Sequence, residues 1–315
     1  MSDQLYLWPD EHAGGRLSWS LSRDRRLRDC LRKYYLQHFG SRGGGQAGAS
    51  GEAREAYVLK HLRTRHMWVG EVVHEMIELA LAAIRRGDAV PVEAIVERGT
   101  RRMRAQYAES LQGVYRERPH QACGLSEHEY REDISRDEWK RQRDRMEACV
   151  RAFFELELLR DLKAAPPWRW LAVESLASFE LEGATIVVKP DFAWRDQQDR
   201  VVVVDWKTGK RRGEEDWLQV AVYGLFARRA WGLGAQPLMG RLVYLESGES
   251  LDVELLPADL ERAEAFVKSS VAHMRGLHSD AAAGMQARFP LTEDRSLCLH
   301  CNFRRLCGRQ QPAPA

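Results

Sequence analysis

Apolar residues recur at helical spacing through the first half of the chain and form short β-branched runs in the second half. The helical half ends at Pro166-Pro167, where two consecutive prolines stop any helix. Runs rich in valine, isoleucine and aromatic residues indicate strands. The pattern predicts helices over 15–39, 52–86, 91–113, 126–163, 216–231 and 258–276, and strands near 170–181, 185–194, 200–207 and 240–247. A flexible glycine-rich loop is expected over 40–51, and the whole is an α/β arrangement with one core sheet.

Two strand-like runs in the second half flank a polar turn and predict a β-hairpin. They are IVVKPDFAW (186–194) and RVVVVDWKTGK (200–210). A turn centred near Gln198 sets Asp191 opposite Asp205, because both lie equally far from it, and cross-strand Cβ atoms are about 5 Å apart. Lys207 shares the face of Asp205, since side chains alternate along a strand. The hairpin therefore presents two carboxylates and one amine at a single place.

These residue types suit a divalent cation beside a phosphodiester. Paired carboxylates hold Mg²⁺ or Mn²⁺, which prefer oxygen ligands. The cation lowers the pKa of a bound water, and a lysine orients that water or neutralises developing charge. A surface Asp–Lys salt bridge is the alternative. It fits the four valines before Asp205 poorly, because such a run indicates a strand buried on both faces.

Other candidate residues lie outside the hairpin. His74 lies on the predicted helix 52–86, where a lone histidine more often packs than binds a ligand. Gln219 and Tyr223 are four residues apart and share a helix face, which is equally typical of an amphipathic helix with an interfacial tyrosine. Glu174 lies on a neighbouring strand, where a surface glutamate is more typical than an acid behind the site.

Together these motifs resemble a known family. Pro190-Asp191 followed by Asp205-x-Lys207 is the signature of the PD-(D/E)XK nucleases, and the form DWKTGK is similar to the RecB/AddB branch, which includes CRISPR-adaptation exonucleases. The helical histidine and the Gln-x3-Tyr pair appear in the family's order, and the resemblance covers roughly residues 20–310. Many members carry a glycine shortly before the first aspartate, where this chain has Val188-Lys189-Pro190.

The resemblance implies a fold, an activity and roles for residues. The fold is a restriction-endonuclease-like core, a mixed sheet flanked by helices, with a helical insertion and a C-terminal lid. The metal ligands that it implies for Mg²⁺ or Mn²⁺ are His74, Asp191, Asp205 and the carbonyl of Trp206. Lys207 activates or orients the attacking water, while Gln219 and Tyr223 position the substrate strand and buttress the site.

Cysteines form a second group of candidate site residues. Cys298-x2-Cys301-x5-Cys307 lies near the C-terminus, and residues 1–15 lack the apolar core of a signal peptide. A reducing, cytoplasmic compartment is therefore expected, where clustered cysteines indicate metal binding. Cys30 is the natural fourth ligand, whereas Cys123 and Cys149 lie outside the pattern and His300 is more typical of a spacer than of a substitute ligand.

One N-terminal cysteine joined to C-x2-C-x5-C resembles the [4Fe–4S] site of AddB-type nucleases and their CRISPR relatives. Four cysteines suit structural zinc as well. The nuclease resemblance favours iron, as a structural clasp between the two ends of the chain.

Composition and charge narrow the range of expected binding partners. The 315 residues are 44% hydrophobic and carry a net charge of +2, so positive charge is local, as in residues 23–33 with six Arg or Lys against two Asp. Such a run is a solvated helix face or, beside an active site, a phosphate contact. No apolar run approaches membrane-spanning length, and no Walker motif is present. DNA is the expected partner, and the resemblance adds a helicase or a CRISPR-adaptation integrase.

Four regions follow from these patterns. They are 1–51 with the first cysteine, 52–165 with the His74 helix, 166–256 with the nuclease core, and 257–315 with the cysteine segment and a disordered tail. The favoured function is a metal-dependent DNA nuclease. The resemblance adds a preference for single-stranded ends and a role in repair, recombination or CRISPR adaptation. The alternative is a nuclease-fold DNA-binding scaffold whose partner supplies the activity.

Overall fold

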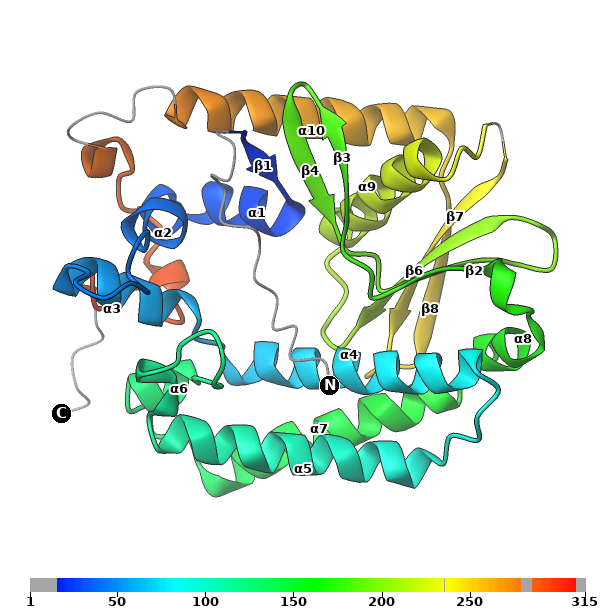
Figure 1. Cartoon of the computed structure of the whole chain (residues 1–315), viewed down its shortest axis with the longest axis horizontal. Helices are drawn as coiled ribbons and strands as arrows, with labels where there is room; N and C mark the ends of the chain where they lie inside the picture. The colour runs from blue at the N-terminus through cyan, green and yellow to red at the C-terminus, as the bar shows by residue number, and fades with distance from the viewer. Residues whose placement is uncertain (1–15, 235, 279–284, 310–315) are drawn as a thin grey trace.

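The computed structural model describes residues 16–234, 236–278 and 285–309. A central sheet lies between two groups of helices, with one group along the bottom and a long helix along the top of Figure 1. The N-terminal helices and the C-terminal segment lie together on the left of that view. Within the described part of the chain, no helix is long and apolar enough to cross a membrane.

The central sheet is mixed and has five strands in the order β2-β5-β6-β7-β8. These are β2 (Trp170–Val173), β5 (Phe192–Arg195), β6 (Val201–Lys207), β7 (Leu238–Tyr244) and β8 (Glu249–Glu254). Only β6 and β7 run parallel among these neighbours. The valines of β6 alternate between two hydrophobic clusters, Val202 and Val204 on one face and Val201 and Val203 on the other. β6 is therefore buried on both faces, as its sequence predicts.

Helices cover both faces of this sheet. On one face, α4 (Arg65–Arg85) packs against α5 (Val92–Leu111) and α7 (Arg136–Phe154). On the other face, α9 (Glu214–Ala230) connects β6 to β7 and packs against α10 (Pro257–His278). The prediction of an α/β fold with a mixed sheet flanked by helices is confirmed.

Two predicted strands each divide between two sheets. A second sheet, in the order β1-β4-β3, comprises β1 (Ser18–Trp19), β3 (Ala177–Leu181) and β4 (Ala184–Val188). The predicted strand 170–181 is therefore β2 and β3, and the predicted strand 185–194 is β4 and β5. Pro190 has no N–H to donate to a ladder, and Glu174 adopts a left-handed φ of 44°. Both features turn the chain from one sheet into the other.

The predicted N-terminal helix 15–39 is not one helix but several elements over its described part, most of them helical. It comprises β1, α1 (Leu21–Asp29), α2 (Leu31–Tyr35) and a π-helix over Leu36–Gly40. Cys30 is extended, with φ −165° and ψ 116°, and its sulfur accepts the N–H of Lys33 at the start of α2. The glycine-rich segment 40–51 forms turns against α3 (Gly51–Lys60), where a Cβ on Gly44 would lie 2.2 Å from the Ala53 carbonyl oxygen.

Two other predicted helices are interrupted by capping residues. The predicted helix 52–86 is α3 followed by α4, and Thr64 caps α4 by accepting the N–H of Met67. The predicted helix 126–163 comprises α6 (Ser126–Glu129), α7 and α8 (Leu158–Ala164). The 3-10 helices are Val114–Arg116, Pro167–Arg169, Met285–Arg288 and Arg295–Cys298. The sequence pattern missed β8, and the predicted tail 308–315 is described only as far as Arg309.

Candidate metal centre and cysteine pocket

Three buried carboxylates lie side by side where β2, β5 and β6 meet. In the β5–β6 ladder, Phe192 pairs with Val204 and Arg195 pairs with Val201. The same register, extended by one residue beyond the Phe192–Val204 pair, sets Asp191 opposite Asp205. The predicted hairpin register is confirmed. On the other side of Asp191, Val173 pairs with Phe192, and the Glu174 N–H donates to the Asp191 carbonyl at 2.8 Å. Sheet register thus brings together Glu174, Asp191 and Asp205, which are 7%, 6% and 1% exposed.

His74 reaches this row of carboxylates from α4. Its Nδ1 lies 3.0 Å from Glu174 Oε1 and 3.4 Å from Asp191 Oδ1, while its Nε2 lies 3.1 Å from the Trp206 carbonyl oxygen. His74, Glu174 and Asp191 each offer a ligand atom within 4.8 Å of the other two. Glu174 is therefore no surface residue, which corrects the interpretation favoured by its sequence context.

The charges around His74 reinforce one another. Burial opposes the imidazolium, but Asp191 and Glu174 outweigh burial and raise the pKa of His74 well above its usual value. Burial likewise opposes the Asp191 carboxylate, while His74 and the Trp206 N–H, which donates at 2.8 Å, lower the pKa of Asp191. The histidine and its carboxylates thus form one compact group of opposite charges.

Lys207 and Gln219 hold Asp205 on the α9 side of the row. The Lys207 ammonium lies 2.7 Å from Asp205 Oδ2 and donates to Gln219 Oε1 at 2.7 Å. The amide nitrogen of Gln219 then faces Asp205 Oδ1 at 2.7 Å and the Tyr223 hydroxyl at 2.9 Å. Burial raises the pKa of Asp205 to about 6, against the opposing effect of Lys207 and with a further increase from Asp191. The predicted Gln-x3-Tyr pair therefore lies directly behind the carboxylates.

Sequence reasoning missed one further residue that contacts the lysine, Asp216. It lies in the first turn of α9, is buried, and approaches the Lys207 ammonium at 3.6 Å. Its other oxygen accepts the Tyr244 hydroxyl at 2.8 Å and the Arg212 N–H at 2.7 Å. Acidic residues are common in the first turn of any helix, so its position alone carries no signal of this role.

The donors suit a hard divalent cation. The group offers carboxylate and carbonyl oxygens and one imidazole nitrogen, the ligand set that Mg²⁺ and Mn²⁺ accept. Octahedral Mg²⁺ bonds at about 2.1 Å, which places neighbouring ligands about 3 Å apart. The 3.1 Å between His74 Nε2 and the Trp206 oxygen matches that spacing. The residues present therefore fit the metal.

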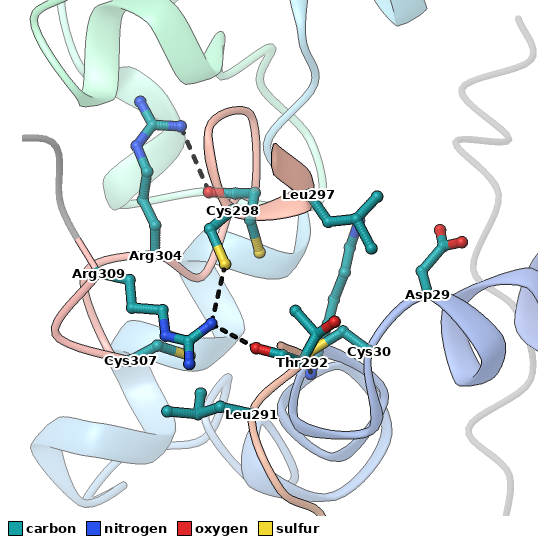
Figure 2. A pocket seen from close by; sticks show the side chains of 11 residues that line it. Asp29, Cys30, Leu291, Thr292, Leu297, Cys298, Arg304, Cys307 and Arg309 are labelled. Carbon is teal, nitrogen blue, oxygen red and sulfur yellow. Dashed lines mark hydrogen bonds between the residues drawn. The ribbon is translucent and has the colours of Figure 1, made fainter. Parts of the chain in front are cut away.

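Four cysteines line a second site, the pocket shown in Figure 2. Cys30, Cys298, Cys301 and Cys307 share this pocket with Lys33, Thr292, Arg304 and Arg309. All four are free thiols, whereas Cys123 and Cys149 are buried in the core around α4. His300 is exposed.

Hydrogen-bond donors face the sulfur atoms of the pocket. Backbone N–H groups of Lys33 and Phe303 donate to Cys30 and Cys301, each at 3.4 Å. Arg309 bridges the Thr292 carbonyl at 2.6 Å and the Cys298 sulfur at 3.5 Å, as Figure 2 shows. Burial and the neighbouring thiols raise the pKa of Cys307 to about 11. A bound cation would reverse that preference, because coordinated thiols lose their protons.

Polar contacts fasten the cysteine segment to the helical half. Arg305 pairs with Glu55 at 2.7 Å and with the buried Glu129 at 2.5 Å. The side-chain amide of Asn302 donates to the Leu59 carbonyl at 2.7 Å, and the backbone carbonyl of Asn302 accepts the Tyr130 hydroxyl at 2.6 Å. The pocket is thus lined by residues near both ends of the described chain, and the intervening helical region holds its C-terminal segment in place.

Comparison with known proteins agrees with this geometry. The family model of the PD-(D/E)XK nuclease superfamily matches residues 18–308, which is most of the chain. A search of curated proteins found no match. The chain belongs to the PD-(D/E)XK nuclease superfamily, whose members are divalent-metal-dependent phosphodiester hydrolases.

Proposed function

We propose that this protein is a DNA nuclease of the RecB/AddB-like branch that removes nucleotides from single-stranded ends. One observation carries the nuclease proposal. His74 and Lys207 converge with the carboxylates of Glu174, Asp191 and Asp205 at the ends of three neighbouring strands. A scaffold subunit without activity would have no need for a buried group of ionisable residues of this composition, since burying charges is costly.

Each residue has a role in the proposed hydrolysis. His74, Asp191, Asp205 and the Trp206 carbonyl would hold one Mg²⁺ or Mn²⁺. When bound, the cation would activate a water and stabilise charge on the phosphoryl oxygens. Lys207 orients that water and stabilises the developing negative charge. Gln219 keeps Lys207 and Asp205 in their mutual position and is itself supported by Tyr223.

The cysteine pocket is proposed to hold a [4Fe–4S] cluster. The support is the donor set, four free cysteines around one pocket with N–H groups and an arginine facing their sulfurs. Its role would be structural, because it joins Cys30 of the N-terminal helices to the C-terminal segment. Zinc is the alternative metal for the same ligands.

The preference for single-stranded ends and a partner helicase or CRISPR-adaptation integrase rest on the family resemblance of the motifs. A reducing, cytoplasmic location suits the free thiols of the cysteine pocket. Basic residues on α1 suit phosphate contacts beside the site, and Arg25 reaches Glu215 on α9 at 3.2 Å. The pathway is repair, recombination or CRISPR adaptation.

A substrate panel tests the proposal. Linear single-stranded DNA, circular single-stranded DNA and blunt duplex of matched sequence are incubated with the purified chain and Mg²⁺ or Mn²⁺. We expect release of short products from the linear single strand and little from the circle. Cleavage of the circle at an equal rate would contradict the exonuclease assignment. No cleavage of any substrate would favour the scaffold alternative.

A further inference from the structure

Glu174 is held in an unusual position beside the proposed metal centre. It has a left-handed φ of 44°, a conformation that residues with side chains rarely adopt. Its side chain is 1% exposed, so the carboxylate is removed from water. A buried carboxylate needs partners, and Glu174 has two: His74 on one oxygen and the Lys189 ammonium on the other.

The imidazole of His74 can present only one of its nitrogens to a metal while the other carries a proton. Nδ1 faces Glu174 at 3.0 Å and lies 3.4 Å from Asp191 Oδ1, and Nε2 faces the Trp206 carbonyl at 3.1 Å. A carbonyl oxygen is itself a metal ligand, and the 3.1 Å spacing matches two neighbouring ligands of an octahedral ion. A metal on the Nδ1 side would instead have to displace the ring from Glu174.

Lys189 is the second partner of the Glu174 carboxylate. It lies in the turn between β4 and β5, and its ammonium pairs with Glu174 on the oxygen that faces away from His74. That pairing satisfies the negative charge of Glu174 without a metal. Glu174 therefore has one oxygen paired with a lysine and the other 3.0 Å from the Nδ1 of His74. Carboxylates placed in this way beside a ring nitrogen orient metal-binding histidines.

We propose that Glu174, held by Lys189, is a positioning residue that remains outside the metal coordination shell and directs Nε2 of His74 to the metal. The proposal rests on the proposed metal-dependent function. It excludes the alternative in which His74, Glu174 and Asp191 bind the metal directly as a three-residue group. Lys189 keeps the third carboxylate from acting as a ligand.

Mn²⁺ binding by the full chain, measured by calorimetry without DNA, separates the two arrangements. Glu174→Gln keeps an oxygen that accepts the Nδ1 proton, so we expect the Kd to change less than about 3-fold, well below the loss typical of a missing outer-shell partner. Glu174→Ala removes the acceptor, and we expect binding that is weaker by about 10–100-fold. Equal losses in both variants would overturn the proposal, as would wild-type affinity in Glu174→Ala. Glu254→Gln, an exposed change on β8, is the control.

Lys189→Met tests the second half of the proposal. Without the ammonium, the Glu174 carboxylate becomes free to join the metal, so we expect tighter Mn²⁺ binding than in the wild type. In that background, Glu174→Gln should weaken binding much more than it does in the wild type. Unchanged or weaker binding by Lys189→Met would overturn the role of Lys189.

The ring proton gives a readout that a purely structural role would not change. Long-range ¹H–¹⁵N spectra of the histidine rings at saturating Mg²⁺ should show the His74 proton on Nδ1, and a proton on Nε2 would overturn the proposal. Neither measurement uses DNA. If the protein bound Mn²⁺ as expected but cleaved no DNA, the proposed nuclease function would be refuted. The inference about Glu174 would be unaffected by that result.

Discussion

The metal centre and the cysteine pocket both join residues that are far apart in the sequence, but different forces hold their donors in place. In the metal centre, sheet register and α4 position the donors, and protein groups already bond each one. In the cysteine pocket, three of the four thiols lie on a segment of turns and 3-10 helix. Ion pairs, one of them with the buried Glu129, a few N–H donors and a small hydrophobic cluster around Phe303 hold that segment.

This difference separates two ways of using a metal. A preorganised centre keeps its shape when empty, so losing one donor should affect chemistry more than folding. A pocket of buried thiols on irregular backbone gains its stability from the metal itself, so losing one donor should affect folding first. The following predictions test that separation.

Lys207→Ala is expected to have the largest effect on activity. Removing a charge that acts on the transition state should slow cleavage of labelled single-stranded DNA by about 10²–10⁴-fold. Mn²⁺ binding and thermal stability should remain, because the sheet holds the other donors. Lys210→Ala, an exposed change three positions further on, is the matched control. Near-normal turnover by Lys207→Ala would remove the lysine from the mechanism.

Cys30→Ser is expected to have the largest effect on stability. The wild-type protein should be brown and contain about four iron atoms per chain, as a [4Fe–4S] cluster held by four cysteine thiolates requires. The variant should lose the colour and the iron, and its Tm should fall. Cys149→Ser, in the core around α4, should keep its iron. If wild-type protein prepared anaerobically contained stoichiometric zinc and no iron, the iron–sulfur assignment would be wrong. A metal that joins the two ends of the chain would still be supported.

Asp216→Asn should have a smaller effect that is confined to the rate. The amide keeps the shape of the side chain but loses the charge that faces Lys207. We expect kcat to fall about 10-fold, since a charge-assisted contact contributes on the order of 1.5 kcal/mol, with KM and Mn²⁺ affinity unchanged. Asp252→Asn, on the exposed face of β8, controls for general loss of charge. A rise in KM with kcat unchanged would indicate a role in binding DNA instead.

Acid should weaken the half of the molecule that carries the cysteine pocket. Burial, against the opposing bond to the Tyr57 carbonyl, lowers the pKa of His61 to about 4, and burial lowers the pKa of His38 well below 6.5. Because these folded-state values lie below the unfolded value, the unfolded chain takes up protons first. The free energy of unfolding should therefore fall as pH drops from about 6.5 towards 4, by at most about 1.4 kcal/mol per pH unit for each histidine.

The variant His61→Gln should show a flatter decline over that range, measured by urea unfolding at each pH. The exposed His273→Gln should follow the wild type. Equal slopes in His61→Gln and the wild type would show that His61 does not couple protons to folding.

Part of the metal centre was predictable because it depends on local rules. Asp191 and Asp205 lie equally far from one turn, and a hairpin register follows from its turn. The spacing of the cysteines likewise indicated a shared site before any fold was known.

Glu174 was not predictable from the same rules. Its strand pairs with β5 through a register shift between Trp170 and Ala172, and its own backbone is left-handed. Both features break the alternation from which a strand's inward face is inferred. The division of two predicted strands between sheets has the same origin, since apolar runs indicate strands but not the sheet that each strand joins.

Cleavage of end-labelled DNA by the wild type and by Asp191→Asn, with Mn²⁺, Mg²⁺, Ca²⁺ or excess chelator, tests most directly whether this group is a hydrolytic metal centre. We expect activity with Mn²⁺ or Mg²⁺, little with Ca²⁺, whose geometry is looser, and none with chelator. Asp191→Asn should be inactive under every condition while remaining folded. Undiminished cleavage by the wild type in chelator, or wild-type activity in Asp191→Asn, would contradict the assignment of the centre.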